Sequence, residues 1–255
     1  MELLGIDIGG SGIKGALVNA ETGEMLTERF RIPTPPDRKP DDMAQVIKQI
    51  VDHFDYKGPV GCGFPTIVKK GVCISPGNLH ESWVGVNIDE LFTEVTGQEF
   101  TVLNDADAAG YASMNYGVGR GKDGLVVMIT VGTGLGSGAF YNGQLLPNFE
   151  LGQIPYKKYD KIEQWAASSA KEREDLSYEK WAKRFNKFLK YVEILVAPDL
   201  IIVGGGISKK WAQYGHLIDI ETDVVKAELM NHAGIIGAAI ACLREQHHGQ
   251  LTSKA

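Results

Sequence analysis

Two short segments of the 255-residue chain combine glycines with side chains that could hold phosphate. The first runs from Asp7 to Lys14 and reads DIGGSGIK, and the second is Gly132-Thr133-Gly134. Glycines let backbone N–H groups approach an anion without a clash from Cβ, and a lysine adds a point charge. Asp7 could also hold a hydrated Mg²⁺. Neither segment has the spacing of a Walker loop, and either one alone could be a structural turn.

A third glycine run, Gly204-Gly205-Gly206, follows the apolar stretch Leu200 to Val203. It is interpreted either as a tight turn from a strand into a helix or as a seat for a nucleotide. The chain holds 31 glycines, about 12% of its residues, against a usual ~7%. Three anion-binding turns would account for this excess better than three unrelated turns.

A polar pair, Asn104-Asp105, follows the apolar stretch Phe100 to Leu103. A carboxylate at the end of a strand is well placed to accept a proton from an alcohol, and a positioned Asp does this in phosphoryl transfer. Asn and Asp are also favoured helix caps, so the pair could simply begin a helix. Both interpretations stay open on these residues alone.

Hydrophobic periodicity and turn residues predict the elements that position these side chains. In the first half we expect strands over 3–8, 13–18, 25–32, 59–64 and 100–103. Helices are expected from Asp41 or Asp42, within 84–96, and from Asn104 or Asp105 to Met114. The sequence thus predicts a β-meander followed by alternating helices and strands.

The same pattern begins again near residue 124. Strands over 124–130, 139–141 and 144–146 surround the glycine turn and an Asn142-Gly143 hairpin turn. They are followed by a helix over 176–197, a strand over 200–203 and a final helix over 233–245, with a frayed tail after His247. This repeat predicts an α/β fold of two lobes with mixed sheets, helices on their faces and a ligand-binding cleft between them. We place the smaller lobe at 1–110, with the helix at about 233–247 packing back on it, and the larger at 111–255.

Composition and charge exclude several function classes. The net charge of −6 argues against nucleic acid or an anionic membrane as a partner. Three widely spaced cysteines fit neither a disulfide framework nor a zinc site, and they are typical of a reducing compartment. The first residues do not resemble a signal peptide, and no apolar run reaches the ~18 residues of a membrane helix. We therefore expect a cytoplasmic protein.

Taken together, these motifs resemble the ROK family of sugar kinases. The resemblance rests on Asp7 to Gly15, Asn104 to Ala109 and Val131 to Ser137, and it extends from about residue 4 to about residue 243. Further similar stretches are Phe64-Pro65, Asn78 to Gly85, Leu146 to Gly152 and Pro198 to Gly206. Within the family the chain most resembles the polyphosphate glucokinases. The resemblance implies the actin-like ATPase (ribonuclease H-like) fold and transfer of a phosphoryl group from polyphosphate or ATP, with Mg²⁺, to the 6-hydroxyl of glucose.

The resemblance also implies roles for individual residues. Asp105 matches the catalytic base. The sugar-binding residues would be Asn78, Asn104, Asp105, Glu150 and Gln153. The phosphate- and nucleotide-binding residues would be Asp7, Gly9, Gly10, Ser11, Gly12, Lys14, Gly132, Thr133, Gly134, Gly205 and Gly206. Asp7 matches the carboxylate near the metal, and the resemblance suggests a homodimer.

One departure from the family pattern bears on the function. The family's E-x-G-H motif reads Glu150-Leu151-Gly152-Gln153, and glutamine is a poor zinc ligand. No cysteine cluster follows, so we expect no zinc site. The change leaves two alternatives open: a kinase for another hexose such as mannose, or a weakly catalytic sugar sensor. An actin-like scaffold is a third alternative, which the residues matching sugar ligands disfavour.

The donor is also open. The helix predicted from Ser177 carries five basic residues, and these form either a solvated face or a surface for polyphosphate. They are Lys180, Lys183, Arg184, Lys187 and Lys190. Lys209-Lys210 and Arg120 with Lys122 are further candidates.

Overall fold

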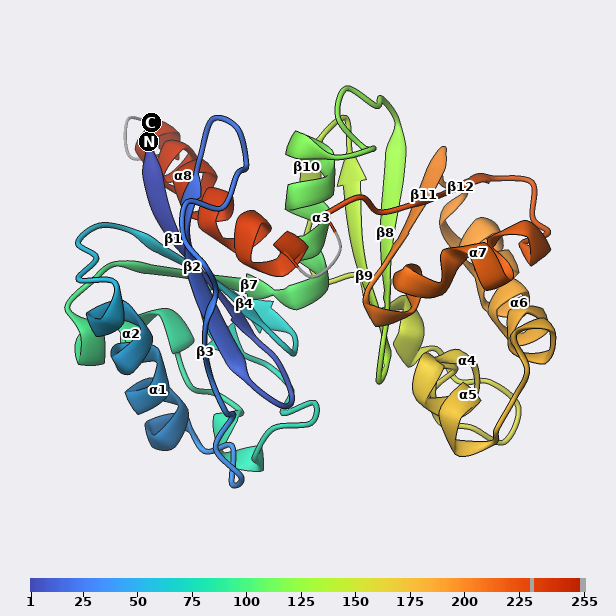
Figure 1. Cartoon of the computed structure of the whole chain (residues 1–255), viewed down its shortest axis with the longest axis horizontal. Coiled ribbons are helices and arrows are strands. Elements are labelled where there is room, and N and C mark those ends of the chain that lie inside the picture. Colours follow the sequence, from blue (N-terminus) through green and yellow to red (C-terminus); the bar gives the residue numbers. More distant parts are fainter. Residues whose placement is uncertain (230–231, 253–255) are drawn as a thin grey trace. The chain divides into compact units, whose positions relative to one another are not determined.

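The computed structural model describes residues 1–229 and 232–252, and the side chains of the last helix as far as Leu243. The chain divides into two compact units (Figure 1). Unit 1 comprises Met1–Ala112 together with His232–Ala255, and unit 2 comprises Ser113–Asn231.

Unit 1 is built on a five-stranded mixed sheet with the order β3-β2-β1-β4-β7. Its strands are β1 (Glu2–Ile8), β2 (Ile13–Asn19), β3 (Phe30–Ile32), β4 (Val60–Phe64) and β7 (Phe100–Asn104). The first three form an antiparallel meander, and β4 and β7 continue parallel to β1. The helices are α1 (Pro40–His53), α2 (Ile88–Thr96), α3 (Asp105–Tyr116) and α8 (Ala233–Thr252), and a small hairpin joins β5 (Val68–Lys69) and β6 (Val72–Cys73).

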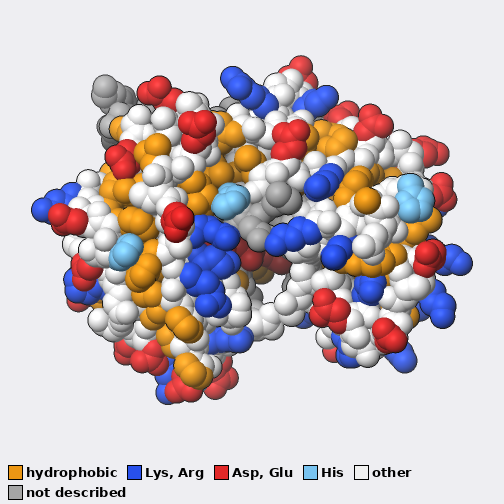
Figure 2. Space-filling model, viewed as in Figure 1, with side chains coloured by type: hydrophobic (Ala, Val, Ile, Leu, Met, Phe, Trp, Pro, Cys, Tyr) orange, Lys and Arg blue, Asp and Glu red, His pale blue; other side chains and the backbone are white. Residues whose placement is uncertain are grey.

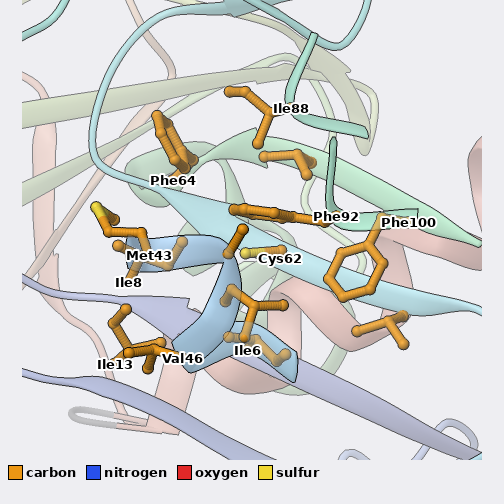
Figure 3. Packing of buried hydrophobic residues seen from close by; sticks show 14 of the residues in the cluster. Ile6, Ile8, Ile13, Met43, Val46, Cys62, Phe64, Ile88, Phe92 and Phe100 are labelled. Carbon is orange, nitrogen blue, oxygen red and sulfur yellow. The ribbon is translucent and has the colours of Figure 1, made fainter. Parts of the chain in front are cut away.

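Alternation along the strands assigns the two faces of this sheet. Ile6 and Ile8 of β1 pack with Ile13, Met43 and Phe92 in one core that α1 and α2 cover (Figure 3). The residues between them point to the opposite face, which α8 covers. Asp7 therefore lies on the α8 face.

Glycines let α8 approach the strands at backbone distance. A Cβ atom on Gly5 would overlap the carbonyl oxygen of Ile235, and one on Gly61 would overlap that of Ala238. Residues from the last helix thus complete the fold of the first strands, and unit 1 is assembled from two distant parts of the sequence.

Unit 2 repeats the same strand order. Its sheet has the order β10-β9-β8-β11-β12, formed by β8 (Leu125–Val131), β9 (Leu135–Tyr141), β10 (Gln144–Leu146), β11 (Leu200–Gly204) and β12 (Asp223–Lys226). In each unit the third, second, first, fourth and fifth strands follow one another across the sheet, so the predicted duplication is confirmed. The helices are α4 (Glu163–Ala166), α5 (Ser168–Arg173), α6 (Tyr178–Val196) and α7 (Trp211–Tyr214). The predicted apolar face of α6, Trp181, Phe185, Phe188 and Val192, is buried in the core of the unit.

Four predicted elements were wrong in their extent, among them the strand expected over 139–141, which begins at Leu135. The strand expected over 25–32 is reduced to Phe30–Ile32, because the Leu17 N–H is taken by the hydroxyl of Thr27 and the ladder is interrupted there. Helix α1 begins at Pro40, and Lys39 occupies the N-cap position without a side-chain hydrogen bond, so Asp41 and Asp42 are not the cap. Helix α8 extends to Thr252, beyond residue 245, where the predicted helix ends. No helix in the described part of the chain is both long enough and apolar enough to cross a bilayer.

Candidate active-site residues

The first glycine turn, Gly9 to Gly12, has all of its carbonyl oxygens engaged. Thr34 donates its hydroxyl proton to the Gly9 oxygen at 2.6 Å, and Gly9 N–H donates to the Gly12 oxygen at 3.1 Å. The guanidinium groups of Arg31 and Arg38 bind the oxygens of Ser11 and Gly10. Within the described residues, the N–H groups of Gly10, Ser11 and Gly12 meet no protein acceptor. Such a turn presents backbone donors to an anion.

Asp7 and Lys14 lie side by side next to this turn. They are directly paired in the β1–β2 register, and Lys14 Nζ lies 3.4 Å from Asp7 Oδ2. Helix α8 begins at the same place, since a Cβ on Gly234 would lie 3.0 Å from Asp7 Oδ1. Because Mg²⁺ in phosphate sites is held by one or two carboxylates together with waters and phosphate oxygens, a single partly exposed Asp fits this role.

Asn104 and Asp105 stand where β7 passes into α3. The buried Asn104 accepts the N–H groups of Ala106 and Asp107 on its Oδ1, at 2.8 and 3.3 Å, which makes it the predicted helix cap. Its Nδ2 donates to the Thr66 carbonyl at 3.2 Å. The Asn104 side chain therefore has a structural role, and the half-buried Asp105 follows it at the first position of α3. A Cβ on Gly63 would lie 3.7 Å from the Cα of Asp105, so Asp105 stands on the α8 face of the sheet, as Asp7 does.

Asn78 is joined to the first turn by Arg38. The two guanidinium nitrogens of Arg38 donate to the carbonyl oxygens of Asn78 at 2.7 Å and Gly10 at 3.3 Å. Arg38 has a left-handed backbone with φ of 50°, and its carbonyl accepts the indole N–H of the buried Trp83 at 2.8 Å. A non-glycine residue held in this conformation costs energy and is often found at functional positions. The sequence alone did not single out Arg38, because nothing local signals its contacts.

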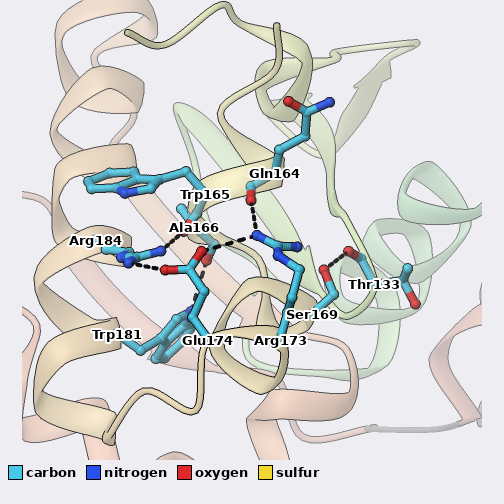
Figure 4. Close-up of polar contacts among 9 residues, drawn as sticks. All are labelled: Thr133, Gln164, Trp165, Ala166, Ser169, Arg173, Glu174, Trp181 and Arg184. Carbon is cyan, nitrogen blue, oxygen red and sulfur yellow. Dashed lines mark hydrogen bonds and ion pairs between the residues drawn. The ribbon is translucent and has the colours of Figure 1, made fainter. Parts of the chain in front are cut away.

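In unit 2, the second glycine turn, Gly132 to Gly134, has the same arrangement as the first glycine turn of unit 1. Ser168 and Ser169 donate their hydroxyl protons to the oxygens of Gly132 and Thr133, at 2.9 and 2.6 Å, and the Gly132 N–H donates to the Gly134 oxygen at 3.0 Å. The contact between Ser169 and Thr133 is visible in Figure 4. Across the described ranges, the N–H groups of Thr133 and Gly134 meet no protein acceptor. Both turns thus expose donors to an anion.

Glu150 is fixed by its two neighbours in the chain. The buried Ser137 hydroxyl donates to the Phe149 carbonyl and accepts the Leu151 N–H, so β9 holds the backbone on both sides of Glu150. Gly152 allows this close approach, because a Cβ there would overlap the Leu135 carbonyl. Burial, together with the nearby Glu163 carboxylate, raises the pKa of Glu150, against an opposing effect of Lys161.

Gln153 meets a carboxylate that the sequence analysis missed. Its Nε2 donates to Glu163 Oε1 at 3.3 Å, and Glu163 Oε2 accepts the Leu135 N–H at 3.0 Å, directly after the second glycine turn. Glu163 thereby connects Gln153 to that turn. Glu163 lies ten residues beyond Gln153 at the start of a four-residue helix, and this position carries no local signal.

Helix α6 supports the segment that carries Glu163 (Figure 4). The Trp181 indole donates to the Ala166 carbonyl at 2.9 Å, and Arg184 donates to the Trp165 carbonyl at 3.1 Å while it forms an ion pair with Glu174. The bond to Arg184 lowers the pKa of Glu174. Arg184, one of the predicted polyphosphate-binding residues, is thus engaged inside the unit.

The third glycine run forms the predicted tight turn from β11 into a short 3-10 helix. Gly205 has φ of 78°, and a Cβ on it would lie 2.5 Å from the Val131 carbonyl oxygen at the end of β8. Gly206 is exposed and has open space around its Cα. The predicted residues therefore form two groups, one in each unit. Among the described residues, no three His, Cys, Asp or Glu side chains are grouped as a metal centre would require.

Two units with one strand order, each carrying a glycine turn at the end of its first strand, define the actin-like ATPase fold predicted from the sequence. The ROK family model matches residues 3–147, and the chain belongs to the ROK family. It is 44% identical over 245 residues to the polyphosphate glucokinase of Mycobacterium tuberculosis, covering 96% of this chain and 92% of the relative.

Solved structures agree with this assignment. The crystal structure of the inorganic polyphosphate/ATP-glucomannokinase of Arthrobacter sp. strain KM has 41% identity and a TM-score of 0.91, covering 96% of this chain and 99% of that one. A ROK family glucokinase from Streptomyces griseus, in complex with glucose and AMPPNP, has the same fold, with a TM-score of 0.82 at 23% identity over 96% of this chain and all of that one.

Proposed function

We propose that this protein is a glucokinase that transfers the terminal phosphoryl group of inorganic polyphosphate or of ATP to the 6-hydroxyl of glucose. The observation that carries the proposal is the pair of glycine turns whose carbonyls are engaged and whose N–H groups are available to an anion. Its substrates follow from the 44% identity to a polyphosphate glucokinase and the 41% identity to a polyphosphate/ATP-glucomannokinase.

In this reaction Asp105 accepts the proton of the 6-hydroxyl while that oxygen forms its bond to phosphorus. The bond from phosphorus to the bridging oxygen of the donor breaks, and the shortened donor leaves. Glu150, Gln153, Asn78 and Asn104 orient the sugar hydroxyls. Of these, Asn104 has the least capacity left, because Ala106, Asp107 and Thr66 already use most of its amide.

Donor phosphates bind the N–H groups of the two turns and the ammonium group of Lys14. Gly205 and Gly206 serve the adenosine side when ATP is the donor. Asp7 would hold a hydrated Mg²⁺ through its water, and the ion would supply charge neutralisation at the phosphate oxygens. The protein's own contribution is to hold the acceptor and donor in line and to supply fixed donors where charge develops.

Mannose is a second candidate acceptor. One structural relative is described as a glucomannokinase, and the Gln153 amide stands where the family has a histidine. An amide both donates and accepts hydrogen bonds, so it suits more than one arrangement of hydroxyls.

Assembly as a homodimer and a place in the cytoplasm complete the proposal. The cytoplasm is proposed because all three cysteines are unpaired and buried.

A panel of hexoses crossed with ATP, GTP and long-chain polyphosphate, read by product mass, tests this proposal. We expect a hexose monophosphate from glucose with polyphosphate and with ATP. Product with ATP alone contradicts the polyphosphate part, and product from mannose but not glucose reassigns the acceptor. Tight sugar binding by calorimetry with no product from any donor would instead identify a sugar sensor.

A further inference from the structure

A row of charged side chains crosses the α8 face of the unit 1 sheet and ends at its edge. Asp7, Lys14 and Arg31 are directly paired in the register of β1, β2 and β3. Residues opposite one another in neighbouring strands point to the same face, so the three side chains follow one another across the sheet. β3 is the outermost strand, and Arg31 stands on it.

The other end of this row reaches Asp105. Asp7 is paired with Gly63 of β4, and the missing side chain of Gly63 leaves room against the Cα of Asp105. The order along the row is therefore the proposed base, Asp7, Lys14 and then Arg31. A chain of phosphates that starts near Asp105 and runs along the row passes Lys14 before it reaches Arg31.

The Arg31 guanidinium has N–H donors beyond the one that it uses within the described fold, and its charge has no carboxylate partner there. It binds the Ser11 carbonyl through one nitrogen, and a guanidinium group has five N–H donors. Among the residues that the structure describes, Arg31 forms no ion pair with a carboxylate. Lys14, in contrast, is partly neutralised by Asp7.

Two further positive groups lie on the same side of unit 1. The charge of Arg29 contributes to the lowered pKa of His232, which immediately precedes α8, although burial is the larger cause. The first turn of α8 contacts Asp7 through Gly234, and the N-terminus of a 20-residue helix carries a partial positive charge. Figure 2 shows Lys and Arg side chains gathered on the visible face of unit 1.

Three of the five basic residues on α6 are already engaged within unit 2. Arg184 is bound to Glu174 and to the Trp165 carbonyl, Lys190 lies 3.7 Å from Asp219, and Lys187 lies over the Tyr191 ring. These three cations have partners within unit 2, whereas the Arg31 guanidinium, among the described residues, bonds the Ser11 carbonyl and pairs with no carboxylate.

We propose that Arg31, beyond Lys14 on the edge strand, binds the phosphates of an inorganic polyphosphate that extend past the first glycine turn. This inference rests on the proposed function and adds a donor subsite to it. Because polyphosphate has no nucleobase to bind, a site for it needs cations repeated along its length. β3 supplies the next cation after Lys14. ATP, whose adenosine is assigned to the turn at Gly205, gains less from Arg31.

The test compares Arg31→Gln with the wild type for glucose phosphorylation by long-chain polyphosphate, by tripolyphosphate and by ATP. We expect kcat/KM for the long chain to fall about fivefold, as for one charge-assisted contact at an exposed position, and the other two donors to lose less. Arg31→Lys should recover part of the loss. The dependence of the long-chain reaction on salt should also weaken in Arg31→Gln, because one screened charge contact is gone.

The matched control is the triple variant Lys180→Gln, Lys183→Gln, Lys187→Gln on α6. A loss with long-chain polyphosphate that is confined to this variant overturns the inference and places the chain on α6. An equal loss with all three donors in Arg31→Gln also overturns it, because Arg31 would then only support the turn at Ser11.

Calorimetric binding of long-chain polyphosphate without sugar separates this inference from the proposed function. Weaker binding by Arg31→Gln than by the wild type, with no product from any donor, supports the subsite and contradicts the kinase. Equal binding by both proteins overturns the subsite even if the kinase assignment holds.

Discussion

The amide of Gln153 donates to Glu163 Oε1, and the other oxygen of that carboxylate receives the Leu135 N–H. One side chain thus connects a residue assigned to the sugar with the end of a turn assigned to phosphate. The donor in this contact is a neutral amide, at the position where the resemblance to the family would place a histidine.

Replacing Glu163 by Ala should loosen this connection. The change leaves the Leu135 N–H and the Gln153 amide without their acceptor, which costs about 1–3 kcal/mol of unfolding free energy. We expect lower kcat/KM with either donor and a lower melting temperature. Glu172→Ala, at an exposed position on α5, is the control and should change neither quantity. Retention of full activity by Glu163→Ala would show that the connection is dispensable.

The raised pKa of Glu150 predicts a pH-dependent cost in stability. Its folded-state pKa lies above the ordinary carboxyl value, so the folded protein binds more protons between these two values and loses stability as the pH rises through them. Glu150→Gln has no such cost. It should melt at a higher temperature than the wild type at neutral pH, and the difference should vanish below about pH 4. Melting curves across this range check the sign.

The same variant should bind glucose less tightly. An uncharged amide accepts hydrogen bonds more weakly than a carboxylate, and bonds to charged groups contribute about 1.5–3 kcal/mol. We therefore expect the dissociation constant for glucose, measured by calorimetry, to rise by about tenfold or more. A variant that is both more stable and unchanged in glucose affinity would remove Glu150 from the sugar site.

Asp105→Asn tests the base. Loss of a general base typically reduces turnover about 10²- to 10⁴-fold. We expect a fall of this size in kcat, with glucose affinity little changed, because the amide keeps the shape of the carboxylate. Steady-state kinetics and calorimetry measure the two effects separately. Asp41→Asn, on the exposed first turn of α1, is the control. An equal loss of affinity and turnover contradicts the assignment.

Gly205 and Gly206 are adjacent and provide a matched pair of substitutions for testing the third glycine turn. Gly205→Ala forces a side chain into a left-handed conformation with φ of 78° and against the Val131 backbone, whereas Gly206→Ala enters open space. We expect the first variant to lose more than about 1 kcal/mol of unfolding free energy and the second to lose little. Thermal or denaturant unfolding distinguishes them. Equal stability of the two variants would show that the turn can relax.

The sequence predicted most of the framework. Ile6, Phe185 and Ile201 belong to strands and a helix whose apolar periodicity can be recognised within a few neighbouring residues. The helix cap at Asn104 and the turn at Asn142-Gly143 likewise have local sequence signatures. The α/β class and the duplicated strand order followed from such local patterns.

Contacts between distant residues were not predictable in this way. Ser168 and Arg38 reach the two glycine turns from segments that have no periodicity of their own, and Glu163 is a single carboxylate on a short helix. The pairing of Arg31 with Lys14 was also not predictable from the sequence. It depends on where β3 begins, and the predicted strand over 25–32 placed that start too early. Residues that support a turn from elsewhere in the chain become visible only when the backbone is placed.

The backbone contact between α8 and the strands at Gly5 and Gly61 has a consequence for biosynthesis. During translation, β1 and β4 leave the ribosome long before residues 233–243 exist, so one face of their sheet stays uncovered while the whole of unit 2 is made. Unit 2 is a continuous segment and can fold first. The amino-terminal half of the nascent chain therefore keeps this face of its sheet exposed until the last helix has been made.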